Sequence, residues 1–156
     1  MNAFRNAGLE YSVPCAGLTE VSTTKIAMNG DYKYSMGCMR GVDGEPCNNC
    51  LKCFRKRGLQ GTPIESNKEV ELKLNARYIP MLPSLLWAKE YKGLEHPALE
   101  NVTKDISWVD KWYDESLHYV PEYLHNYFLE QLKKHSIDPI DDVTPLVNWT
   151  ADSETV

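Results

Sequence analysis

The 156-residue chain contains no run of about 18 consecutive apolar residues, the length that a helix needs to cross a bilayer. Its first ten residues lack the basic and then apolar pattern of a secretory signal peptide. Internal repeats and low-complexity segments are also missing, and 42% hydrophobic with 25% charged residues is ordinary globular composition. These absences predict a cytoplasmic chain with no membrane partner.

Histidine pairs with metal-binding spacing are missing too. The histidines, His96, His118, His125 and His135, form no H-x-x-x-H or H-E-x-x-H pair. We expect each to be a capping, core-edge or surface residue. The chain also lacks a glycine-rich loop that would cradle a phosphate. No nucleophile, general base or oxyanion arrangement can be assigned, so the sequence predicts no catalytic residue.

Charge is spread unevenly along the chain. The net charge is -5, yet residues 138–156 hold five acidic residues and no lysine or arginine, and the rest of the chain is neutral. A block of acid at a chain end is typical of a solvated, flexible segment. We therefore divide the chain into a metal-binding region, residues 1–61, a helical region, residues 62–137, and an acidic, flexible tail, residues 138–156.

Capping residues and apolar spacing predict short helices. One lies within residues 18–30, with Ser22 as its N-cap and Asn29 and Gly30 at its end, and a turn of helix follows Cys50. Another spans residues 82–91, capped by Ser84 and stopped near Gly93. The fold class is thus mainly α, with an irregular metal-bearing loop.

Two further helices carry most of the aromatic residues. Ser107 is placed to cap the first, and Pro121 suits the first turn of the second. Their apolar residues fall at helical spacing: Trp108, Val109, Trp112 and Leu117, then Tyr123, Leu124, Tyr127, Phe128, Leu129 and Leu132. Aromatic residues in such stripes are usually core, so we expect packing rather than base stacking.

Four of the five cysteines form the strongest motif. Cys38, Cys47, Cys50 and Cys53 have the spacing C-x8-C-x2-C-x2-C. An x2 spacing lets two thiolates converge on one ion, and Gly41, Gly44 and Pro46 would let the longer loop bring in Cys38. The pattern predicts one structural zinc ion held by these four residues. The fifth, Cys15, is expected to be a buried free thiol.

Other uses of the motif are an iron-sulfur cluster, which also takes four cysteines, and a redox pair made from one C-x-x-C. The usual cluster spacings differ from this one, and a redox pair leaves two cysteines unexplained. Basic residues flank the motif, namely Arg40, Lys52, Arg55, Lys56 and Arg57. These residues either balance the negative charge of a four-thiolate site or contact phosphate groups. Nucleic-acid binding is therefore an alternative function, although the neutral charge of the rest of the chain weakens it.

The run S-M-G-C-M-R-G-V-D-G-E-P-C-N-N-C-L-K-C-F-R-K-R-G-L resembles the C-terminal zinc site of the 7-cyano-7-deazaguanine synthases, members of the PP-loop (N-type ATP pyrophosphatase) superfamily. The preceding P-C-A-G-L-T-E-V-S-T-T-K-I-A-M is similar to the helix that leads into that site. The likeness covers about residues 14–61. It implies that this region is the C-terminal remnant of a PP-loop α/β fold, with an unmatched helical cluster appended.

Members of that family are ATP-dependent ligases in the biosynthesis of queuosine-type nucleosides. Their nucleotide-binding loop, S-G-G-x-D-S, is absent from this sequence. The resemblance thus implies a zinc-binding portion that performs no ATP chemistry alone, and it leaves open whether the chain takes part in an enzyme. The partner would be a separate ATP-binding chain or a second copy. The alternatives are a non-enzymatic zinc module for protein interaction and a nucleic-acid binder that uses the basic residues beside the zinc site.

Overall fold

The computed structural model describes residues 13–30, 38–75 and 81–149. These residues are mainly helical, as the sequence predicts, and form isolated β-bridges without a sheet. No helix among them is long and apolar enough to cross a membrane. The α-helices are α2 (Glu20–Met28), α3 (Leu51–Leu59), α4 (Lys68–Asn75), α5 (Leu82–Lys92), α6 (His125–Lys134) and α7 (Thr144–Val147). Short 3-10 helices are η3 (Pro97–Leu99), η4 (Asp114–Tyr119) and η5 (Glu122–Leu124).

Helix α2 begins at a different cap from the one the sequence suggested. Thr19 has extended backbone angles and its side chain accepts a hydrogen bond from the Ser22 amide, so Thr19 is the N-cap. Ser22 is fully buried inside the helix, where its hydroxyl donates to the carbonyl of Lys111 at 2.9 Å. The predicted end is confirmed, because Asn29 is the C-cap.

Helix α5 shows the same kind of shift at its start. Its N-cap is Met81, and Pro83 in the first turn supplies the fixed φ that favours a helix start there. Ser84, the predicted cap, is buried within the helix. The stop at Gly93 is confirmed: this residue has φ 70°, a left-handed conformation that glycine adopts without steric cost.

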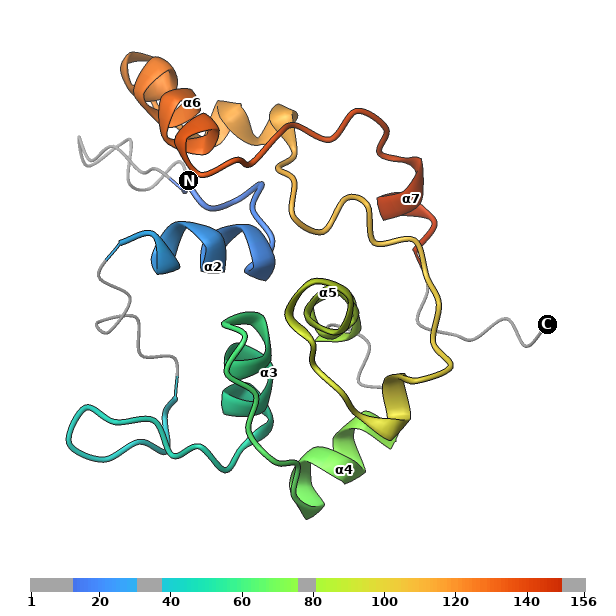
Figure 1. Cartoon of the computed structure of the whole chain (residues 1–156). Helices are drawn as coiled ribbons and strands as arrows, with labels where there is room; N and C mark the ends of the chain where they lie inside the picture. The colour runs from blue at the N-terminus through green and yellow to red at the C-terminus, as the bar shows by residue number, and fades with distance from the viewer. Residues whose placement is uncertain (1–12, 31–37, 76–80, 150–156) are drawn as a thin grey trace, which may run out of the picture.

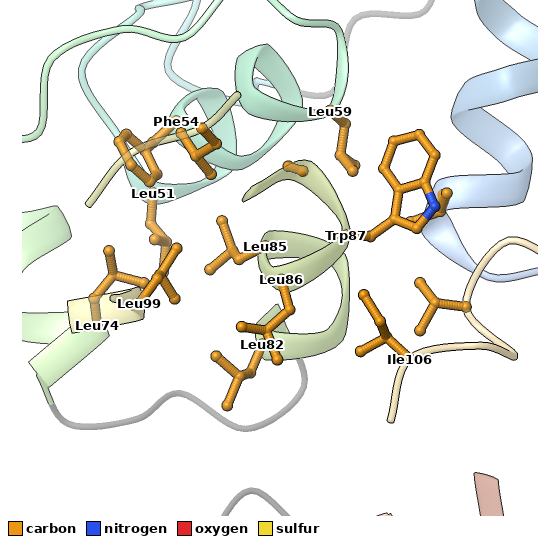
Figure 2. Close-up of a cluster of buried hydrophobic side chains, with 14 of the residues drawn as sticks. Leu51, Phe54, Leu59, Leu74, Leu82, Leu85, Leu86, Trp87, Leu99 and Ile106 are labelled. Carbon is orange, nitrogen blue, oxygen red and sulfur yellow. The ribbon is translucent and has the colours of Figure 1, made fainter. Parts of the chain in front are cut away.

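Helices α3 and α5 form the centre of the main hydrophobic core. Figure 1 shows α5 nearly end-on beside α3, and this pair makes the most extensive contact between helices. Figure 2 shows Leu85 of α5 pointing toward α3, which contributes Leu51, Phe54 and Leu59. The buried residues of this core come from both sides of the predicted boundary at residue 61: Val21, Leu51, Phe54, Leu59, Val70, Leu74, Leu82, Leu85, Leu86, Trp87, Ala88, Leu94, Leu99, Ile106 and Val109.

The predicted helix after Ser107 is absent; turns and the 3-10 helix η4 replace it. The Ser107 amide donates a hydrogen bond to the side chain of Asp105 in a local turn. Further along, the Trp112 amide donates to the carbonyl of Asp138, and its own carbonyl accepts from Ile140. Long-range backbone pairing has therefore overridden the helical spacing around Trp112.

A second, smaller cluster surrounds Trp112. Its buried members are Trp112, Leu132 and Ile137, and Phe128 of α6 packs edge-on against the Trp112 ring at 5.8 Å. The prediction that the aromatic stripes pack in a core is correct for these rings and for Trp108, which packs against the main core. It is wrong for Tyr123 and Tyr127, which are 73% and 63% exposed, because η5 and α6 turn only one narrow side inward.

Part of the predicted acidic tail is built into the structure. Residues 138–140 pair with Trp112, Lys111 Nζ lies 2.7 Å from a carboxylate oxygen of Asp141, and the short helix α7 follows. The Trp149 ring stands edge-on to Trp108 at 6.5 Å. The flexible tail stays a prediction for residues 150–156, which lie outside the described residues.

Candidate metal centre

The structure brings the four predicted cysteines together. The four sulfur atoms all lie within 4.8 Å of one another; they belong to Cys38, Cys47, Cys50 and Cys53. The sulfurs of Cys47 and Cys53 are 3.7 Å apart. In a tetrahedral site with Zn–S bonds of about 2.3 Å, the sulfurs are about 3.8 Å apart. The cluster therefore has nearly the spacing of a tetrahedral four-thiolate site, and it can hold a metal ion.

The loop between Cys38 and Cys47 reverses through a tight turn. Val42 and Glu45 exchange two backbone hydrogen bonds across Asp43 and Gly44, which have φ values of 51° and 84°. Two central residues with positive φ are typical of a type I′ turn, for which Asp-Gly is a favoured pair. Gly41 is needed for a different reason: a Cβ there would lie 2.2 Å from the carbonyl oxygen of Glu45.

Helix α3 supplies the buried half of the cluster. Cys50 is its N-cap and Cys53 lies in its first turn, and both side chains are buried beside Leu51 and Phe54. This confirms the predicted turn of helix after Cys50. Asn48, at φ 51°, turns the chain just before the helix. The cysteine cluster is thus joined directly to the helix that contributes to the main core.

Backbone amides and side chains outside the cluster hold the sulfur-bearing loop. The Cys47 amide donates to the Cys38 sulfur at 3.5 Å, and the Asn49 amide donates to the Cys47 sulfur at 3.4 Å. The Asn67 side chain donates to the Asn49 carbonyl at 3.0 Å and also caps α4 by accepting from the amides of Glu69 and Val70. Such second contacts orient the ligands of metal sites.

The thiols of Cys38, Cys47 and Cys53 have displaced pKa values. The hydrogen bond from the Cys47 amide lowers the pKa of Cys38 to about 6. Burial raises the pKa of Cys53 to about 12. Four thiolates at this spacing repel one another unless a cation lies among them, and a divalent metal ion supplies that charge. The donor set therefore fits a soft divalent cation.

Most of the basic residues around the site already have partners. Arg40 Nη1 lies 2.6 Å from Glu69 Oε2, and this contact raises the pKa of Arg40. Arg55 Nε lies 2.5 Å from Glu20 Oε2, with both side chains largely covered. Arg57 donates to the Asn48 side chain. Much of the basic flank is therefore paired with other side chains of the same chain.

The remaining predicted residues lie away from the cluster. Cys15 is a free thiol, as expected, but it is exposed rather than buried, because it lies in a surface turn that ends at Leu18. His96 is a capping residue: its Nδ1 accepts from the Ala98 amide, and its Nε2 lies 3.1 Å from Glu71. Asn67 was not predicted as a residue of the site; its signal in the sequence is a capping residue followed by acidic residues at 69 and 71.

The fold and the site together define a helical protein with a four-cysteine cluster able to hold a metal ion. The family model described as "Family of unknown function (DUF6395)" matches residues 1–79, and the chain belongs to this family. The matched part holds the whole cluster and helices α2 to α4, while α5, the main packing partner of α3, lies beyond it. Neither curated proteins nor solved structures gave a match.

The family result corrects the resemblance to 7-cyano-7-deazaguanine synthases. The family model covers the same cysteines, and no PP-loop or synthase family matches the chain. Short cysteine spacings report how a chain wraps around one metal ion, and unrelated folds reach the same geometry. The assignment of residues 14–61 to that synthase family was therefore wrong. The nucleoside pathway and the ATP-binding partner rested on that assignment and stay untested predictions.

Proposed function

We propose that this chain is a non-catalytic, zinc-stabilised helical module that works through protein contacts. The observation that carries the proposal is the convergence of four cysteine sulfurs at the start of α3. Zinc is the ion that best suits four thiolates in a tetrahedron, and four protein ligands leave no open position for a substrate. The role of the metal is then structural: it fastens the loop of residues 38–49 to α3.

Protein contacts are supported by the surface of η5 and α6. Tyr123 and Tyr127 lie four residues apart and are both exposed, and Leu124 and Leu129 are partly uncovered beside them. Large side chains exposed on one short segment favour a contact surface. We propose that two copies of the chain associate through this surface. Sedimentation velocity tests it: the double variant Tyr123→Ser with Tyr127→Ser should stay monomeric at concentrations where the parent associates, and a monomeric parent would contradict it.

Nucleic-acid binding has weaker support. Arg40, Arg55 and Arg57 contact side chains of the chain itself, which reduces the positive charge available to phosphates. A duplex or single strand bound with steep salt dependence would favour this alternative over the structural module.

Metal analysis of the protein purified without added metal tests the zinc site directly. The expected result is one zinc ion per chain and no visible absorbance, since Zn²⁺ has a filled d shell. Cys15→Ser should bind the same amount, while Cys47→Ser should lose the ion. Iron with visible absorbance, or fully reduced protein without metal, would contradict the proposal.

A further inference from the structure

We propose that the cysteine cluster is also an oxidative switch, in which Cys38 and Cys47 are the first pair to form a disulfide. The inference rests on the proposed zinc site. Cys38 and Cys47 are partly exposed, whereas Cys50 and Cys53 are 8% and 4% exposed. An oxidant that arrives from solvent therefore meets the loop half of the cluster before the helix half.

The two exposed cysteines are also the ones that are able to move together. A disulfide has an S–S length of about 2.05 Å, so sulfurs within 4.8 Å of each other must still approach. The side chains of Met39 and Val42, near Cys38 on the loop, are 97% and 72% exposed, so apolar packing does not fix this part of the loop. Cys53 is fixed by comparison, because it lies in a helix whose Phe54 is buried in the core.

The chemistry needs one peroxide for each disulfide. One of the two thiolates attacks one oxygen of hydrogen peroxide, the O–O bond breaks, hydroxide leaves and that cysteine becomes a sulfenic acid. The other thiolate then attacks that sulfur, the S–O bond breaks and a second hydroxide leaves, which joins Cys38 to Cys47. The two sulfurs lose two electrons and the peroxide gains them. Two of the four ligands are consumed, so the remaining pair no longer holds the metal tightly.

The test uses the zinc-loaded full chain carrying Cys15→Ser, which removes the one exposed cysteine outside the cluster. Hydrogen peroxide is added at one equivalent, zinc release is followed with a chromogenic chelator, and the disulfide is located by peptide mapping. We expect a Cys38–Cys47 disulfide, stoichiometric zinc release and recovery of binding after phosphine reduction. Zinc that stays bound, or a first disulfide that involves Cys50 or Cys53, would overturn the inference.

Matched histidine variants sharpen the test. Cys38→His and Cys50→His each keep three thiolates and one imidazole, a ligand set that zinc accepts. Only Cys50→His keeps the exposed pair, so Cys38→His should release zinc about tenfold more slowly than Cys50→His. Equal rates would overturn the inference. If either variant fails to bind zinc, the disulfide map of the parent decides. A parent purified without metal would instead contradict the proposed zinc site.

Discussion

The loop of residues 38–49 and helix α3 are neighbours in sequence but are held by different forces. The loop exposes its apolar side chains, Met39 and Val42, and keeps its shape through a turn and sulfur contacts. Helix α3 buries Leu51, Phe54 and Leu59 in the main core. Ordering a residue costs about 1 to 2 kcal/mol, which the loop does not recover by burial. The dependence of folding on metal should therefore change near Cys50, where the loop meets the helix.

Truncating a core side chain of α3 should have the largest effect on the free energy of unfolding. Phe54 is 1% exposed and lies among Leu51, Leu59 and the side chains of α5. Phe54→Ala should lower the free energy of unfolding by about 3 to 5 kcal/mol, because it removes apolar contacts and leaves a cavity. Urea unfolding of the zinc-loaded protein measures the change.

Met39→Ala is the matched control on the loop. Met39 is 97% exposed, so its loss should change the free energy of unfolding by no more than about 0.5 kcal/mol. A Met39→Ala effect as large as that of Phe54→Ala would remove the distinction between loop and helix.

Removing the contact between the loop and α4 should have an intermediate effect on the free energy of unfolding. Asn67 caps α4 through its side-chain oxygen and holds the Asn49 carbonyl through its side-chain nitrogen. Asn67→Ala removes both contacts and should destabilise the protein by about 1 to 2 kcal/mol. Asn67→Asp keeps the cap but replaces the donor to the loop with a carboxylate oxygen that faces the Asn49 oxygens. Thermal unfolding of both variants separates the two roles, and an Asp variant as unstable as the Ala variant would show that the loop contact dominates.

Much of the site was predictable from sequence because it is local. The cysteine spacing located the cluster, and Asn29 and Gly93 marked helix ends that require particular backbone angles. The starts of α2 and α5 were misplaced because serines compete with stronger local signals, the extended Thr19 and the proline of α5. Trp112 was misassigned because its partners, residues 138–140, lie far along the chain. Pairing at that separation leaves no mark on local periodicity.

Low pH should lower the stability of the fold by a smaller amount, through Glu71 of α4. A hydrogen bond from Ser66, together with one from His96, lowers the pKa of Glu71. A carboxyl whose folded pKa is lowered stabilises the folded state above its unfolded pKa, about 4.3, and loses this as pH falls through the folded pKa. Glu71→Gln should therefore flatten the fall in stability below about pH 4.3. Urea midpoints measured against pH for both proteins test this, and parallel curves would contradict it.

Hydrogen exchange with and without a strong chelator tests whether metal holds the loop of residues 38–49 in place. Structural zinc contributes about 10 to 16 kcal/mol in small peptides, and the apolar side chains of the loop, Met39 and Val42, are exposed and do not stabilise it by burial. On metal removal the amides of residues 38–49 should exchange as in an unfolded chain and the first turn of α3 should fray, while α5 stays protected by the core. A loop that stays protected without metal, or an α5 that loses its protection together with the loop, would contradict the account.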